Sequence, residues 1–445
     1  CTLADLLVLP QEHTIKKMFS RLSNKNTKRS SNRIFYGWWM VASAMFLMFF
    51  TTGVSFFGFS AFFDPIRKDL GWTRAQAAQG PSIREVYQSV MAPFVGFLVD
   101  RFGPRKVIPP TMFISGLGFI LLARVTTPSH YFLALILIGT GMGWTAYVMV
   151  NTAINNWFIK SRGKALGATS MGPGFGGILV ALIVFFIDTE GWRVVAHSIG
   201  IITCVVAVPI TLFLRGAPEN YGLLPDGRTV DVSKENSSLK DSEMEDEAQF
   251  SFTEVLKDRS YWLFIIACGF QQMAVSAMVV HHIPALVSFG ITSQVAGLLV
   301  LIFTLSSLPL RFFSGYLADK YDPRMVFISM LILQLSGAVI LIGVFNIWIA
   351  LLFEITYGIG WGGSTSARLS LQGHYWGRSI FGSLMGIQIG SGAVGGLIAP
   401  VLVGWLADTS GYRFAFSLMI VTLVIAVIMV HLMRTPNIIQ ESING

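Results

Sequence analysis

The chain has 445 residues, of which 53% are apolar and only 13% are charged, whereas a soluble domain carries roughly 25% charged residues. Its mean hydropathy of +0.62 requires many segments that face lipid or one another, which excludes a soluble enzyme, a disordered scaffold and a disulfide framework. The net charge of +8 is typical of nucleic-acid binding, but the basic residues lie between apolar runs, so we expect a lipid bilayer and no nucleic acid.

Apolar runs long enough to cross a membrane recur along the whole chain, since a transmembrane helix needs about 20 such residues. They predict an all-α membrane protein with twelve transmembrane helices. In chain order, the expected spans are 37–63, 74–99, 106–125, 131–158, 164–187, 193–214, 261–289, 294–318, 325–345, 347–375, 380–406 and 413–433.

The basic residues orient these spans. Lysines and arginines precede the first span and follow spans two, four and eight, and the loops after spans seven and nine have none. Arg67 and Lys68, after span one, are an exception. By the positive-inside rule, we expect both termini to be cytoplasmic. We also expect a multi-pass protein of the plasma (cell inner) membrane. The expected domains are a basic tail (1–34), a six-helix half (35–214), a cytoplasmic linker (215–260), a second six-helix half (261–433) and a cytoplasmic tail (434–445).

The two halves repeat one another in sequence. The segment GFLVDRFGPR at 96–105 matches GYLADKYDPR at 315–324, at an offset of 219 residues. Two shorter matches, at offsets of 220 and 217, pair 188–193 with 408–413 and 141–144 with 358–361. Six spans is an even number, so both halves enter the membrane from the same side. The halves are therefore expected to be parallel and pseudo-symmetric about an axis along the membrane normal.

The first of these repeats resembles a known family motif. Its pattern, G-x-x-x-D-R-x-G-x-R, is similar to the signature loop of the major facilitator superfamily, and the resemblance extends from Arg33 to Arg434. In that family the loop latches the cytoplasmic side while the carrier faces outward. The resemblance implies that Asp100 faces the start of span eleven near Arg378, and that Asp319 faces the start of span five near Arg162. The implied latch residues are Gly96, Asp100, Arg101, Arg105, Arg162, Gly315, Asp319, Arg324 and Arg378.

Shorter motifs resemble one branch of this superfamily. They are YGWW at 36–39, GWTR at 71–74, PENYGLLPD at 218–226, HIP at 282–284 and GIT at 290–292. Together they are similar to the monocarboxylate-transporter-like and oxalate–formate antiporter branch. Members of that branch carry small organic anions, so the resemblance implies a substrate of this class.

Arg311 is the leading candidate for the contact with such a substrate. It lies eight residues before Asp319, about 12 Å along an α-helix from the cytoplasmic end and thus near the middle of the membrane. In the branch, an arginine of span eight at the corresponding place binds the substrate carboxylate, whose shape matches the planar fork of a guanidinium. A structural ion pair and snorkelling toward the cytoplasm are the alternatives.

Two departures from the branch concern the substrate and its coupling. Dicarboxylate carriers pair this arginine with a lysine of span eleven, and the place is taken here by Gln388, so the single cation favours a monocarboxylate. Gln388 can still donate hydrogen bonds to a substrate. Proton-coupled carriers have an aspartate one turn before the arginine, where this chain has Ser307, so their proton switch is absent in its usual form.

Other ionisable residues within the spans are candidates for proton coupling, namely Glu85, His281, His282 and Glu354. Histidine titrates near neutral pH and suits a proton relay. The alternatives are an ion pair with an arginine for either glutamate, and an ordinary polar contact at the membrane interface for the histidines.

Two pseudo-equivalent tryptophans, Trp144 and Trp361, lie near the midpoints of spans four and ten, each after a Gly-x-Gly sequence. Aromatic walls with a few polar groups suit a small organic anion. We therefore expect both to line the substrate site, together with Tyr147 and Asn151, one and two turns below Trp144. The alternative role for a tryptophan here is helix packing.

These features predict a secondary active transporter that moves a small organic anion, with a monocarboxylate favoured, by alternating access. Either H⁺ symport or anion exchange would drive it, so protons or a counter-anion are expected partners, and the carrier is expected to act as a monomer. No nucleotide-binding, metal-ligand or nucleophile motif occurs, so we expect no enzyme activity, cofactor or metal. The alternatives are a carrier of a sugar, drug or siderophore, and a ligand-binding membrane sensor of the same fold.

Overall fold

The computed structural model describes residues 35–72, 74–221, 223–227 and 251–434, which are helical and contain no strand. The tail predicted at 1–34, linker residues 228–250 and residues 435–445 lie outside this part. Before the linker the elements are α2 (Tyr36–Thr51), η1 (Thr52–Phe57), α3 (Phe59–Asp69), α4 (Arg74–Phe102), α5 (Pro104–Leu122), α6 (Pro128–Gly141), α7 (Trp144–Trp157), α8 (Arg162–Phe175), α9 (Gly177–Glu190), α10 (Trp192–Ile202), η2 (Thr203–Ala207) and α11 (Val208–Thr211).

Two short 3₁₀ turns, η3 (Pro218–Tyr221) and η4 (Pro225–Gly227), lie at the start of the linker. The later elements are α13 (Phe252–Lys257), α14 (Arg259–Ser288), α15 (Ser293–Ala318), α16 (Pro323–Ile342), α17 (Ile347–Trp376), α18 (Phe381–Ala415) and α19 (Ser417–His431).

In the described part, nine helical stretches are long and apolar enough to cross a membrane. Two further helices, α4 with 29 residues and α17 with 30, are as long but carry more polar side chains, and α19 is apolar but has 15 residues. The all-α membrane fold agrees with the prediction. The count of twelve spans and their parallel pseudo-symmetric halves stay predictions.

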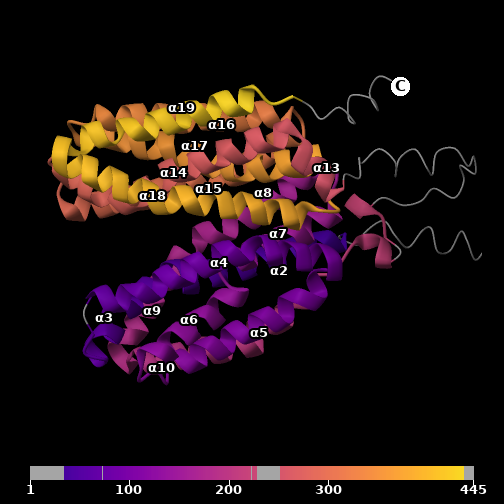
Figure 1. Ribbon diagram of the computed structural model, residues 1–445, viewed down its shortest axis with the longest axis horizontal. Coiled ribbons are helices and arrows are strands. Elements are labelled where there is room, and N and C mark those ends of the chain that lie inside the picture. The colour runs from indigo at the N-terminus through magenta and orange to yellow at the C-terminus, as the bar shows by residue number, and fades with distance from the viewer. Residues whose placement is uncertain (1–34, 73, 222, 228–250, 435–445) are drawn as a thin grey trace, which may run out of the picture.

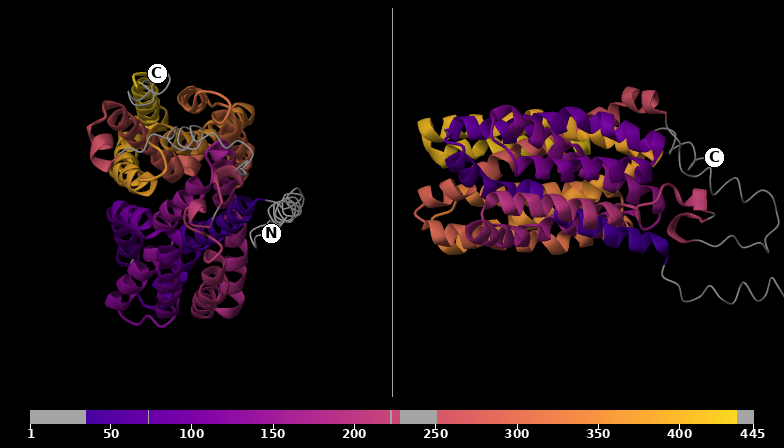
Figure 2. Two further views of the ribbon diagram at one scale, coloured as in Figure 1. Left: turned by 90° about the vertical axis from the view of Figure 1, so that its right-hand side faces the viewer. Right: turned by 90° about the horizontal axis from the view of Figure 1, so that it is seen from below.

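The buried apolar side chains form two clusters. One runs from Met40 to Leu214 and is joined by Leu369, Phe381 and Met385, and the other runs from Val255 to Met433. Figures 1 and 2 show the corresponding helices as two groups that lie side by side, indigo to magenta before the linker and orange to yellow after it. We call these the first and the second helix group.

The two groups pack closely through glycines at one end of the bundle, where α4 ends at Phe102 and α15 at Ala318; we call this the motif end. A Cβ added at Gly96 of α4 would collide with the carbonyl oxygen of Gly382 on α18. Gly315 of α15 and Gly163 of α8 oppose each other in the same way. Small residues let helix backbones approach in a membrane, so the motif glycines set the spacing of the groups.

The expected span 131–158 is broken near its middle. Gly143 has φ of 72°, a left-handed conformation that favours glycine, and it separates α6 from α7. The amide Nε2 of Gln88 donates to the Met142 carbonyl oxygen at 2.8 Å, which satisfies a group that the break frees. The equivalent Gly360 lies inside the continuous helix α17. The two sequence repeats thus differ locally in backbone structure.

Replacing Gly315 by alanine should destabilise the contact between the groups, because the new methyl group has no space against Gly163. We expect a loss of about 1–3 kcal/mol in the free energy of unfolding, as for other overpacked sites. Gly297→Ala is the matched control on the same helix, because nothing lies within 4 Å of its added Cβ. Thermal unfolding in detergent checks this, and equal stability of the two variants would contradict it.

Candidate functional site

Arg311 of α15 lies where the second helix group meets the first. Its Nη1 donates to the carbonyl oxygen of Ser170 on α8 at 3.0 Å. The side chain is only 5% exposed, and its Nε is buried without a hydrogen-bond partner. No ion pair among the described residues includes Arg311. A buried guanidinium is costly unless an anion offsets its charge, so this site has the electrostatic character of an anion-binding site.

Aromatic side chains surround this guanidinium. Its Cζ lies 4.7 Å from the ring centroid of Trp361 on α17, a cation–π geometry. Tyr147 of α7 lies close enough to interact electrostatically with Arg311. Asn151 donates to the Tyr147 carbonyl oxygen at 2.8 Å, and its Oδ1 is buried without a partner. Of the aromatic residues expected here, Trp361 and Tyr147 are thus beside Arg311, and Trp144 begins α7 with its side chain outside the described part.

Gln388 forms a separate cluster in the second helix group. Its Nε2 donates to the sulfur of Cys268 at 3.1 Å, and Gln388 is buried on α18. Arg368 of α17 also hydrogen-bonds Cys268. The side chain of Gln388 thus bonds within the second helix group, and its place around the guanidinium of Arg311 stays a prediction. The sequence assigns Arg368, an arginine within a span, to the gate or to structure rather than to the substrate site.

The proton-coupling candidates lie in three different settings. His282 of α14 and Glu354 of α17 form a buried pair, with His282 Nε2 and Glu354 Oε1 2.8 Å apart. His281 instead contacts the Pro400 carbonyl oxygen at 2.8 Å and the Tyr412 hydroxyl at 3.3 Å. Glu85 interacts electrostatically with its neighbour Arg84 on α4. The alternative of an arginine partner for Glu354 is wrong, because a histidine occupies that place.

One aromatic side chain connects the histidine pair with the arginine. The ring of Phe303 on α15 lies edge-on to His282, with centroids 5.6 Å apart. The same ring stacks on Trp361, with centroids 5.2 Å apart and planes at 16°. Glu354, His282, Phe303, Trp361 and Arg311 therefore form one continuous chain of contacts across α14, α15 and α17.

The two motif aspartates cap helices of the opposite group. Asp100 accepts hydrogen bonds from the backbone N–H groups of Gly382 at 3.0 Å and Ser383 at 2.7 Å, at the start of α18. Asp319 accepts from the N–H groups of Gly163 at 2.6 Å and Lys164 at 2.9 Å, at the start of α8. A carboxylate at a helix N-terminus satisfies free N–H groups and interacts favourably with the helix dipole. Each contact joins the two helix groups as the repeat predicts.

Burial and hydrogen bonding act in opposite directions on Asp319. Burial raises the pKa of this carboxyl to about 6, and the N–H groups of Lys164 and Gly163 oppose the rise by favouring its charge. Asp319 is therefore mostly ionised at pH 7. Its charge strengthens the two hydrogen bonds that it accepts.

The motif-end arginines make different contacts. Arg162 donates to the Gly373 carbonyl oxygen of α17, and Arg378 donates to that of Asn156 on α7 at 3.1 Å, so both join the groups. Arg378 also pairs with Glu219 of the linker at 2.6 Å. Arg105 donates to the Tyr221 hydroxyl at 3.3 Å, and Arg101 lies over the rings of Phe97 and Phe102.

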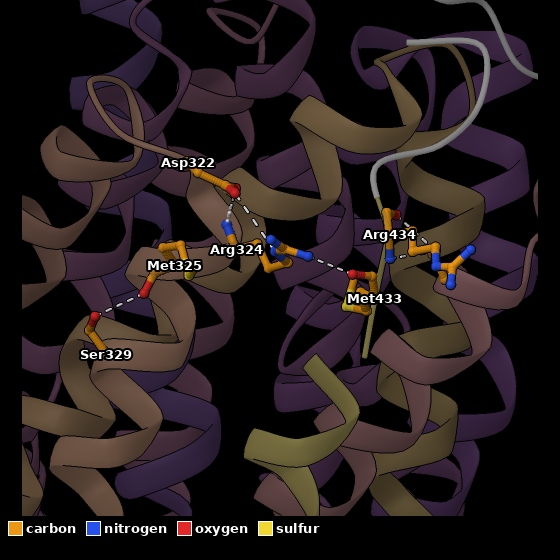
Figure 3. Close-up of polar contacts among 7 residues, drawn as sticks. Asp322, Arg324, Met325, Ser329, Met433 and Arg434 are labelled. Carbon is orange, nitrogen blue, oxygen red and sulfur yellow. Dashed lines mark hydrogen bonds and ion pairs between the residues drawn. The ribbon is translucent and has the colours of Figure 1, made fainter. Parts of the chain in front are cut away.

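Arg324 acts within the second helix group. Figure 3 shows its Nη1 donating to the Met433 carbonyl oxygen beyond α19 at 2.5 Å, and Asp322 accepting from the Arg324 backbone N–H at 2.9 Å. The Arg324 side chain also lies 3.7 Å from the Asp322 carboxylate. These contacts cap the start of α16 and fasten it to the end of α19, so Arg324 does not bridge the groups as Asp319 does. No metal-binding group of three or more His, Cys, Asp or Glu occurs in the described part.

Comparison with known proteins agrees with this architecture. The family model of the Major Facilitator Superfamily matches residues 45–288 and 283–442. The oxalate:formate antiporter of Oxalobacter formigenes is 24% identical over 414 residues, covering 91% of this chain and 93% of the relative. Monocarboxylate transporter 11 of Homo sapiens is 25% identical over 409 residues, covering 84% of this chain and 78% of the relative.

Solved structures share the fold. The fucose:proton symporter FucP of E. coli has a TM-score of 0.64 at 16% identity, over 89% of this chain and 98% of its own. The proton:xylose symporter XylE has a TM-score of 0.67 at 14% identity, over 88% of this chain and 94% of its own. The chain therefore belongs to the Major Facilitator Superfamily, and its relatives confirm the predicted resemblance to the monocarboxylate-transporter and oxalate–formate antiporter branch.

Proposed function

We propose that this protein is a secondary carrier of a small organic anion, with a monocarboxylate as the favoured substrate, and that Arg311 binds the carboxylate. The observation that carries the proposal is a buried guanidinium, 5% exposed, with a free Nε and no ion pair in the described part. A carboxylate would supply the missing negative charge and accept two parallel hydrogen bonds. Relatives named for oxalate, formate and monocarboxylates support an acid of this class.

The position of Arg311 supports transport rather than binding alone. Its contacts come from α8 of the first group and α17 of the second, so an anion bound there lies between the groups. In this superfamily the substrate site lies at such an interface, and the groups rock about it. Arg84 is also buried, but its contacts with Ser55 and Phe59 keep it inside the first group.

Arg368 favours a second candidate substrate. It is another cation inside the second group, and its Nε is buried without a partner. A dicarboxylate could bind Arg311 through one carboxylate and Arg368 through the other, if it were long enough to reach from Arg311 to the cluster of Cys268, Gln388 and Arg368. Oxalate therefore belongs with lactate, pyruvate and formate among the acids to be tested.

Counterflow in proteoliposomes tests the proposed function. Vesicles loaded with an unlabelled acid should take up the same labelled acid faster than empty vesicles, since a carrier returns with either form. A membrane sensor binds the ligand without this exchange. Absence of counterflow for every acid, despite binding, would contradict a carrier and favour the sensor.

Arg311→Gln should reduce counterflow at least tenfold. Glutamine removes the charge and the planar fork, and each hydrogen bond to a charged group contributes about 1.5–3 kcal/mol. Arg84→Gln is the matched control, because it removes a second buried arginine without touching the contact between the groups. Initial rates of labelled lactate or oxalate uptake check this, and loss of counterflow in Arg84→Gln alone would contradict the assignment.

We further propose that Asp100 and Asp319 hold the motif end closed and that this end is cytoplasmic. Asp319→Asn should loosen it, because the amide oxygen accepts hydrogen bonds without the charge that strengthens them. A cysteine at the buried Thr152, in a background without native cysteines, should then react with a maleimide roughly tenfold faster, which corresponds to about 1.4 kcal/mol. Asp322→Asn is the control in the same loop, and equal labelling rates in both variants would contradict the latch.

A further inference from the structure

We propose that Glu354 and His282 form a proton-binding site, and that its proton is exchanged in step with the anion at Arg311. The inference rests on the proposed function. It adds the driving force for transport, a proton gradient, so that the protein is a proton-coupled carrier. The geometry points to two ionisable side chains from different helices that share one hydrogen bond away from water.

The pair is built to hold a proton. His282 Nε2 lies 2.8 Å from Glu354 Oε1, His282 is 5% exposed and Glu354 is 0% exposed. Glu354 Oε2 is also buried and has no hydrogen-bond partner. An ionised carboxylate in that position leaves one oxygen unsolvated, whereas one added proton makes the pair neutral overall. The site therefore has two states that differ by one charge.

Other ionisable groups near the pair are engaged elsewhere. On α14, His281 points to Pro400 and Tyr412 of α18. Tyr357 of α17 accepts from Gln334 of α16 at 3.1 Å. On α15, the charge that faces this region is Arg311, reached through Phe303 and Trp361. On α17, Arg368 hydrogen-bonds Cys268 and His374 contacts Ser370. The other charged or titratable groups of the packed elements lie at or near the helix ends, and they are Arg162 and Lys164 of α8, Arg259 of α14, Arg324 of α16, Asp408 and Arg413 of α18, and His431 of α19.

The charges of the pair, of Arg311 and of the substrate have to be balanced together. Without a proton the pair carries −1, which balances Arg311 when the anion is absent. With one proton the pair is neutral, and the substrate carboxylate balances Arg311. Summed over the pair, Arg311 and the substrate, a proton alone leaves +1 and an anion alone leaves −1, and both are costly in a membrane interior. The two balanced states are the ones that can reorient, so one proton accompanies one carboxylate.

The distance between the two sites allows this coupling. Glu354 and Trp361 are seven residues apart on α17, about two turns or 10 Å. Arg311 lies against the Trp361 ring. For charges about 10 Å apart at an effective dielectric constant of about 20, one unit charge changes the affinity for an anion by roughly tenfold. The proton moves between the pair and water on either side of the membrane, and no covalent bond forms or breaks.

Two transport assays, counterflow and pH-driven accumulation, distinguish the proton site from the carrier function on which it rests. Proteoliposomes are tested for counterflow of labelled L-lactate, formate and oxalate, and then for accumulation of the active acid when the outside is one pH unit more acidic. We expect the native protein to do both. Glu354→Gln, which imitates the protonated acid permanently, should retain counterflow and lose most of the accumulation. His281→Gln is the neighbouring control and should accumulate the acid.

Each outcome decides between the alternatives. Counterflow without pH-driven accumulation in the native protein, or accumulation unchanged in Glu354→Gln, would overturn the proton site and leave the carrier intact. Counterflow of none of the three acids would overturn both.

A second measurement does not depend on a variant. The native protein in weakly buffered detergent at pH 7 should take up about one proton per molecule when the active acid binds, as followed by a pH indicator. Binding without proton uptake would also overturn the inference.

Discussion

A positive charge buried without a counter-ion is the constraint on which this structure depends. Arg311 lies between the two helix groups, held by one backbone carbonyl and one aromatic ring. Such a charge is tolerated in a membrane when an anion or a remote negative group offsets it. Two features bear on this: the Nε has no hydrogen-bond partner, and Glu354 lies about two turns along α17 from Trp361, the ring that the guanidinium contacts. The proposed anion binding and the proposed proton coupling therefore rest on the same electrostatic demand.

The motif end supplies the complementary mechanical element. Glycine contacts bring α4 against α18 and α15 against α8, and Asp100 and Asp319 cap the helices so approached. A few hydrogen bonds join the groups at this end, so their loss costs little compared with unfolding a helix group. The packed clusters are larger, and apart from Leu369, Phe381 and Met385 each lies within one group. This contrast suits rocking of two rigid groups about a site between them.

The sequence predicted features that depend on depth and repetition. Hydropathy indicated the helices, and the repeat placed Asp100 and Asp319 opposite the starts of α18 and α8. What it could not predict is the angular position of a side chain around its helix. Gln388 has a depth like that of Arg311 and yet faces Cys268. His282 and Glu354 are 72 residues apart on separate helices, so only the packing of α14 against its neighbours makes them a pair.

The most direct test of the central claim is the thermal unfolding of the purified protein with lactate and with its neutral amide. A ligand that binds the folded state stabilises it, by about 2.7 kcal/mol at 100 times its dissociation constant. If Arg311 binds the carboxylate, lactate should stabilise the native protein and its amide should not. Pyruvate, formate and oxalate are further acids to test. None of the acids should stabilise Arg311→Gln. Equal stabilisation by acid and amide, or stabilisation that survives in Arg311→Gln, would contradict the account.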